Sequence, residues 1–256
     1  MGAIVGAALA IIAGASLGEP AETVLLVIGL PDLPMHMRLD ALSRVFLVLL
    51  GSASAGVSLF ASGYFRKGEG TAPGLLGLQY HAFLASMGFV LLADDAYAFM
   101  VAWESMALAS YFLVTSQHGI PEIRSAGFLY LLMAHVGAIA ILLSFGILQG
   151  GTWQFTFDAM RAADLSAAWA SAAFLLALFG FGAKAGLIPL HIWLPEAHPA
   201  APSPVSALMS GVMLKTAIYG VLRVTFDLIG EPQWWWGLVP LALGLATALF
   251  GVVFAA

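Results

Sequence analysis

The chain has 256 residues, of which 61% are hydrophobic and only 9% are charged, and its formal net charge is −5. Soluble domains carry about 25% charged residues, so this chain cannot cover a water-facing surface, and lipid must be the solvent for most of it. The sparse, acidic charge excludes nucleic-acid binding, and the absence of cysteine excludes disulfides, iron–sulfur ligation and thiol chemistry.

Apolar runs of about 20 residues recur along the chain, each long enough to cross a hydrocarbon core of about 30 Å. All of them should be helices, because backbone polar groups in lipid must be satisfied within the segment. The runs also lack the alternation of a β-barrel strand. We therefore predict an all-α fold, a polytopic transmembrane helix bundle of about eight spans. The expected spans are 2–18, 42–63, 74–93, 95–116, 126–149, 168–194, 203–229 and 236–256.

The segments between the runs are short and carry most of the charges. Residues 22–40 combine a β-rich start with two prolines, which favours a small hairpin at the membrane surface. Asp94 and Asp95 fall at a turn between two spans, where we expect them to be solvated. The last run stops at Ala256 without a polar flank, which suggests that the chain is a fragment of a longer protein.

The basic residues divide between the two ends of the predicted bundle. One end would collect Arg66, Lys67 and Arg124, and the other Arg38, Arg44, Arg161 and Arg223. Because both ends carry arginine, the positive-inside rule does not decide the orientation.

Three ionisable residues lie well inside predicted spans, where a charge costs roughly 2.5–3.5 kcal/mol on insertion scales. Glu104 is either a protonated acid bonded to a neighbouring helix or a charge that pairs with a lysine and tunes its proton affinity. Lys184 precedes two prolines that interrupt its helix, and broken helices at membrane depth line cavities or are buried in protein. Lys215 lies beside small and polar neighbours. For both lysines, the alternative is a side chain that extends to the interface.

The histidines offer further proton carriers. His191 and His198 lie between the two lysines in the sequence and could relay protons, since the unperturbed pKa of imidazole is about 6.5. For His198, a structural hydrogen bond is the alternative. His135 lies in the middle of a span and is either a relay member or a core histidine. No HExxH motif, P-loop or GxGxxG motif occurs, so we expect no cofactor, no metal and no active site of the chain's own.

Residues 191–220, HIWLPEAHPAAPSPVSALMSGVMLKTAIYG, resemble the signature of the antiporter-like, proton-translocating membrane subunits of complex I and related hydrogenases. The pattern is a lysine, a proline-broken helix that ends in H-x-W-L-P-[DE]-A-H, and a second lysine. WESMALASYFLV, residues 103–114, is similar to the family's glutamate helix. Within the family, residues 81–117 look similar to component B of the hydrogenase 4 and formate hydrogenlyase type complexes.

The resemblance implies three regions. Residues 1–73 would hold N-terminal spans and a surface hairpin, and 74–229 a five-helix repeat whose broken helix is 168–194. Residues 230–256 would begin a further span, with the family's second repeat missing. The resemblance also implies that Glu104 pairs with Lys184, that Lys215 is the next member of a polar axis, and that the loop at 64–73 is cytoplasmic.

We therefore expect a proton-translocating, multi-pass subunit of a redox-driven complex in the cell inner (plasma) membrane. The complex would be of the hydrogenase 4, formate hydrogenlyase or NADH-quinone oxidoreductase type, with its other membrane subunits and the lipid bilayer as partners. Movement of charge on Glu104 would release a proton from Lys184 towards Lys215 through His191 or water. The alternatives are a sodium/proton antiporter subunit of the multisubunit type and a scaffold that only anchors a hydrogenase.

Overall fold

A computed structural model of the chain describes residues 1–30, 33–64 and 71–255. Within these ranges, seven helical segments are long and apolar enough to cross a membrane, and a shorter apolar helix, α1 (Gly2–Ala15), precedes them. The predicted polytopic helix bundle is confirmed. The expected cations Arg66 and Lys67 lie outside the described residues.

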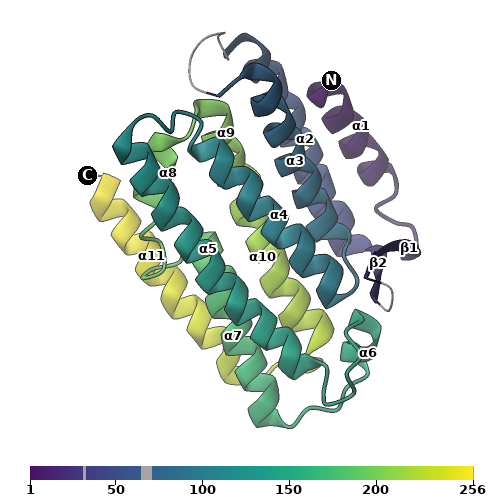
Figure 1. Cartoon of the computed structure of the whole chain (residues 1–256). Helices are drawn as coiled ribbons and strands as arrows, with labels where there is room; N and C mark the ends of the chain where they lie inside the picture. Colours follow the sequence, from purple (N-terminus) through teal and green to yellow (C-terminus); the bar gives the residue numbers. More distant parts are fainter. Residues whose placement is uncertain (31–32, 65–70, 256) are drawn as a thin grey trace.

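The long helices follow the predicted apolar runs. They are α2 (Ala41–Tyr64), α3 (Pro73–Leu92), α4 (Ala96–Val114), α5 (Pro121–Leu148), α7 (Ala167–Ala185) and α11 (Leu238–Ala255), the last preceded by the 3-10 turn η3 (Trp234–Gly237). Another span joins α9 (Ser203–Leu208), the π-helical turn η1 (Met209–Met213), α10 (Leu214–Leu222) and a second π-helical turn, η2 (Arg223–Leu228). The helices run side by side, with α1 along α2 at one edge and α11 at the other (Figure 1), where the start of α11 packs against α7.

The helix starts follow from local chemistry. Pro73 and Pro121 occupy the first turns of α3 and α5, where a missing amide donor costs nothing. Asp95 caps α4 by accepting the amide of Ala98 at 2.6 Å, and Thr156 caps the short helix α6 (Phe157–Arg161).

The predicted break follows directly after Lys184. Helix α7 ends at Ala185, and Gly186 adopts a left-handed conformation with φ of 77°. A side chain at position 186 would also collide with Leu194, so only glycine fits there. Turns then lead to the short helix α8 (Leu194–Ala200), which turns into α9. The break therefore begins three residues before Pro189.

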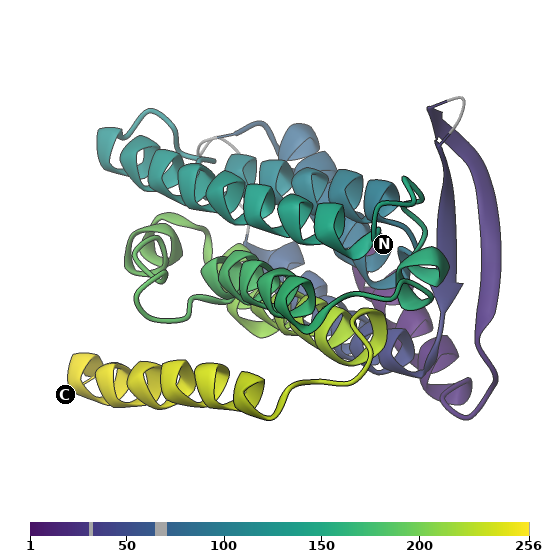
Figure 2. The same ribbon diagram turned by 90° about the horizontal axis from the view of Figure 1, so that it is seen from below.

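The predicted surface hairpin is also present. β1 (Glu22–Leu30) pairs antiparallel with β2 (Leu33–Leu39), with an irregularity in register between Leu26 and Gly29. It stands at one side of the bundle, near the end that holds α6 (Figure 2). Hydrogen bonds from Arg44 to the carbonyls of Glu19 and Pro20 fasten the chain just before the hairpin.

The expectation that Asp94 and Asp95 are solvated is wrong. Their relative exposures are 5% and 3%, because the hairpin and α6 fold over the turn between α3 and α4. Asp95 accepts the backbone amide of His36 at 2.6 Å, in addition to capping α4. Asp94 pairs with Arg161 at 3.1 Å. Burial raises the pKa of Asp94 above its usual value, and the Arg161 charge only partly opposes this effect.

Asp94 belongs to a charged cluster that joins the hairpin end, α6 and η2. Arg223 donates to Asp40 at 2.6 Å and to Asp227 at 2.9 Å, and Arg161 donates to Asp227 at 2.9 Å. Burial alone would raise the pKa of Asp40, but the hydrogen bonds and charge of Arg223, with bonds from Ser43, lower it to about 2. The cluster ties together segments that lie up to 183 residues apart.

Helices α5 and α7 approach each other closely through glycine. A Cβ atom added at Gly180 would lie 2.5 Å from the carbonyl oxygen of Gly137, which leaves no room for a side chain. Small residues allow such close backbone contact between membrane helices. Tyr130 lies two turns before Gly137 on α5, and Lys184 lies one turn after Gly180 on α7. The glycine contact therefore places these two side chains opposite each other.

Candidate functional site: a buried lysine at a helix break

Lys184 is the last residue but one of α7 and is only 3% exposed. Its ammonium donates to the hydroxyl of Tyr130 at 2.6 Å and lies 4.6 Å from the centre of the same ring. Among the described residues, no carboxylate oxygen lies within 4 Å of this ammonium. Lys184 thus has a neutral partner and a cation–π contact instead of an ion pair.

The Tyr130 hydroxyl connects several helices at this point. It contacts the Ser110 hydroxyl of α4 at 2.5 Å and lies 3.6 Å from the sulfur of Met213 in η1. Its ring meets Trp193 edge to face, with centroids 5.0 Å apart. Trp193 in turn donates to the carbonyl of Ala183 at 2.8 Å. Side chains from α4, α5, η1 and the helix break therefore pack around Lys184.

Glu104 lies on α4, and its observed partner is His135 of α5. The carboxylate oxygen Oε2 and the imidazole Nε2 are 3.5 Å apart, and both side chains are partly exposed. Glu104 lies on the same helix as Ser110, which contacts Tyr130 beside Lys184. The structure thus brings Glu104, His135, Tyr130 and Lys184 into one region. Within it, Glu104 contacts His135, and Lys184 contacts Tyr130.

Lys215 lies on an exposed face of α10. Its ammonium donates to the carbonyl oxygen of Ser210 at 2.6 Å, so it stays against its own helix. Within the described ranges, no carboxylate oxygen lies within 4 Å of the Lys215 ammonium. In this chain, Lys215 therefore faces outward at the depth of a span.

The two histidines of the break are half-buried. His198 bonds the Ser206 hydroxyl through Nδ1 at 2.8 Å and stacks near Trp193, with centroids 6.3 Å apart. Its Nε2 and the Nδ1 of His191 are buried without a hydrogen-bond partner. The indole of Trp193 packs against both His198 and Tyr130, so His198 reaches the lysine site only past this ring.

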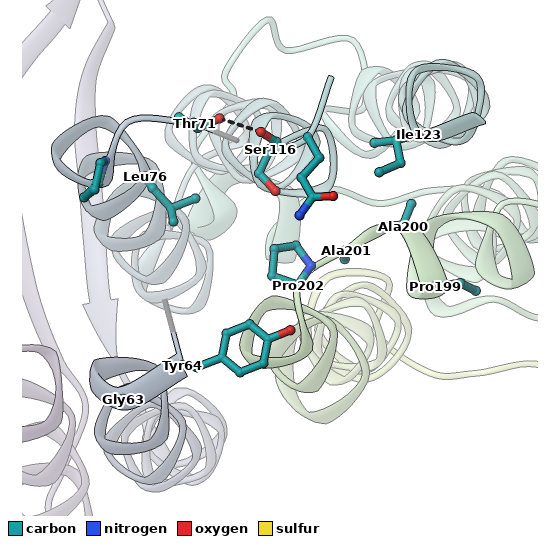
Figure 3. Close-up of a pocket in the computed structure, with 12 residues that line it drawn as sticks. Gly63, Tyr64, Thr71, Leu76, Ser116, Ile123, Pro199, Ala200, Ala201 and Pro202 are labelled. Atoms are coloured by element: carbon teal, nitrogen blue, oxygen red, sulfur yellow. Dashed lines mark hydrogen bonds between the residues drawn. The ribbon is translucent and has the colours of Figure 1, made fainter. Parts of the chain in front are cut away.

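A pocket of about 490 Å³ opens beside the α8–α9 junction. Its wall includes Tyr64, Ser116 and Pro202, and Thr71 donates to the Ser116 carbonyl at its rim (Figure 3). The lining residue Pro199 directly follows His198 in the chain. The pocket thus brings an open surface close to the histidine of the broken helix.

Sequence reasoning missed Tyr130 and Ser110. Neither carries a charge, and isolated hydroxyls in an apolar run are common. The one available signal was the position of Tyr130 in the middle of a span that also carries His135, since a mid-span polar group needs a partner. Within the described ranges, no group of three or more His, Asp or Glu residues could hold a metal ion.

These features define a class: a multi-pass membrane protein whose bundle encloses an ammonium group at a break in one of its helices. The chain belongs to the family described as NADH:quinone oxidoreductase/Mrp antiporter, TM, whose model matches residues 93–256.

Relatives and solved structures agree with this assignment. The chain is 42% identical to hydrogenase-4 component B of Escherichia coli (strain K12) over 223 residues, which are 86% of this chain and 33% of that protein. It is 30% identical to formate hydrogenlyase subunit 3 of the same strain over 221 residues, 86% of this chain and 34% of that protein. A chain of the Mrp complex from Dietzia sp. DQ12-45-1b matches with a TM-score of 0.84 and 28% identity, over 99% of this chain and 28% of that chain. The chain thus spans about one third of the length of the curated relatives it matches.

Proposed function

We propose that the chain is a proton-translocating membrane subunit of a redox-driven complex of the hydrogenase 4 or formate hydrogenlyase type. The burial of Lys184 beside the helix break is the observation that supports this proposal most. An ammonium within a span costs free energy that stability alone does not explain, and such groups mark ion pathways. The names of two relatives, hydrogenase-4 component B and formate hydrogenlyase subunit 3, favour this type of complex.

In the proposed path, water takes up a proton at the pocket beside the α8–α9 junction and passes it to His198. The Nε2 of His198 and the Nδ1 of His191 are buried without a protein partner and could each bond water. Lys184 receives the proton next, and Glu104 with His135 controls its release. Residues 74–229, from α3 to η2, would act as one five-helix unit around these groups.

Lys215 would carry the proton onward from this unit. Its outward position in a span favours a polar surface of another segment or subunit over lipid, because an ammonium exposed to acyl chains is costly. We therefore propose that other membrane subunits of a hydrogenase or complex-I-like assembly are its partners.

The test measures proton uptake by inverted membrane vesicles that contain the native complex, driven by that complex's own redox substrate. Lys184→Met and Glu104→Gln should each reduce uptake by at least about 100-fold, because each removes a proton carrier. The complex should still assemble, because each new side chain is similar in size to the one it replaces. Arg124→Ala and Glu122→Gln change exposed charges at the start of α5 and should leave uptake unchanged. Normal uptake in both the Lys184 and Glu104 variants would show that the chain only anchors the complex.

A sodium/proton antiporter subunit is the second candidate, favoured by the TM-score of 0.84 to a chain of the Mrp complex. The two functions differ in the ion. If the chain is a subunit of a redox-driven proton pump, proton uptake in the same vesicles is independent of sodium. A proton movement that requires a sodium gradient and no redox substrate would favour the antiporter.

A further inference from the structure

Lys184, Tyr130 and Ser110 form a chain of hydrogen bonds. As an ammonium, Lys184 has only donors, and the Tyr130 oxygen then accepts from it at 2.6 Å. Ser110 donates to the carbonyl of Met106 at 2.6 Å, so its oxygen is free to accept the Tyr130 proton at 2.5 Å. Both hydroxyls then have an acceptor for their proton, and the ammonium has one hydrogen-bond partner among the described residues, the Tyr130 oxygen. The Tyr130 hydroxyl therefore holds the lysine in place without a carboxylate.

The tautomer of His135 is fixed in a similar way. Its Nδ1 lies 2.8 Å from the carbonyl oxygen of Leu131, which can only accept, so Nδ1 carries a proton. A neutral His135 would then turn the lone pair of Nε2 towards the Glu104 carboxylate at 3.5 Å, and the two would repel. The contact is attractive only when one further proton is present, either on Nε2 or on the Glu104 carboxyl.

We propose that His135 and Tyr130 are positioning residues that hold Glu104 and Lys184 apart in one state of the transport cycle. This inference rests on the proposed function. In the state seen here, one shared proton holds Glu104 against His135 while Tyr130 holds the Lys184 ammonium. When that proton leaves to water, the Glu104 carboxylate is repelled by the Nε2 lone pair and turns towards Lys184. The proton content of the Glu104–His135 pair thus sets whether the Glu104–Lys184 pair is open or closed.

The surroundings allow this exchange. Among the described residues, the polar side-chain contacts around Glu104 and Lys184 come from His135 and Tyr130, both of α5. No arginine or second carboxylate of the described ranges pairs with Glu104 or His135, so the two partners compete for Glu104 without a third.

His135→Gln tests the proposal, because glutamine keeps hydrogen-bonding capacity and cannot hold the proton. The matched control is His81→Gln: His81 contacts the carbonyl of Gly77 through Nδ1 at 2.7 Å in the same i, i−4 arrangement, without a carboxylate partner in the described ranges. Redox-driven proton uptake should fall about 100-fold in His135→Gln and stay normal in His81→Gln. Tyr130→Phe, which keeps the ring over Lys184 and removes the hydroxyl, should also reduce uptake.

A second readout separates positioning from a general loss of structure. In infrared spectra of the purified complex recorded over pH, a Glu104 carboxyl band and a His135 imidazole band should change together in one step. In His135→Gln, the carboxyl band should change at a different pH. An unchanged carboxyl titration with normal uptake in His135→Gln would overturn this inference, and the proposed function would stand if Lys184→Met and Glu104→Gln still abolish uptake.

Discussion

At the scale of single residues, the charged cluster shows how this chain makes buried charge stable. Arg223 satisfies its guanidinium with Asp40, Asp227 and the Tyr219 hydroxyl, so no ion in the group is left alone. A buried charge without partners costs several kcal/mol, whereas a fully bonded group can be retained. The cluster fastens the hairpin end of α2 to η2 at the end of another span.

Asp40 gives this cluster a defined dependence on pH. Its folded pKa of about 2 lies below the unfolded value of 3.8, so its contribution is present above about pH 4 and is lost as the pH falls towards 2. Asp40→Asn should therefore lower the free energy of unfolding by about 2 kcal/mol near neutral pH, and the difference from the wild type should shrink between about pH 4 and 2. Circular dichroism during denaturant unfolding in micelles measures both.

Asp158→Asn is the control in the same cluster, since its side chain is 71% exposed against 16% for Asp40. It should change the unfolding free energy by less than about 0.5 kcal/mol at any pH. Equal effects of the two substitutions would mean that Asp40 gains nothing from its burial beside Arg223.

Single residues also mark the limit of sequence reasoning. Glu104, Lys184 and His135 could be singled out because a titratable group in an apolar run seldom has a purely structural role. Their contacts could not, because Tyr130 meets Lys184 across 54 residues and only the packing of α5 on α7 brings them together. Asp94 and Asp95 were misjudged for the same reason: their cover, the hairpin and α6, is distant in sequence.

At the scale of helices, the close contact of α5 and α7 determines the geometry of the lysine site. Gly180→Ala would place a methyl group against the Gly137 carbonyl and the backbone of Ile141. The helices must then separate, which should cost about 1–3 kcal/mol and weaken the Tyr130–Lys184 bond. Unfolding in micelles and proton uptake in vesicles should both be impaired.

Gly146→Ala provides the matched control, because a Cβ at this helical glycine of α5 meets open space. It should raise stability by about 0.5–1 kcal/mol through helix propensity and leave uptake unchanged. The same effect for both substitutions would contradict a role for the glycine contact.

The helices themselves were predictable, because hydropathy and length suffice in lipid. The apolar run 126–149 corresponds to α5, and the prolines after Lys184 predicted a break in the helix. The point of the break was not predictable from proline: Gly186 ends α7, since its backbone conformation and the nearby Leu194 exclude other residues. The π-helical turns η1 and η2 were not predicted from the sequence.

At the scale of the whole molecule, the bundle combines an apolar exterior with a few polar groups on its outer faces. Glu104, His135 and Lys215 are each at least partly exposed at the depth of a span. Glu104 and His135 contact each other, whereas lipid offers the Lys215 ammonium no further partner and another membrane protein segment can. The chain spans about one third of the length of the curated relatives it matches.

The central claim is that water reaches Lys184 although it is buried, and cysteine accessibility in the native complex tests this most directly. The chain has no cysteine of its own, so Lys184→Cys introduces one target, and Ala177→Cys, two turns earlier on α7 and 1% exposed, is the control. A water-soluble methanethiosulfonate needs a thiolate, which forms only where water is present, so position 184 should react at least about tenfold faster than position 177. Equally slow modification at both positions would contradict the account.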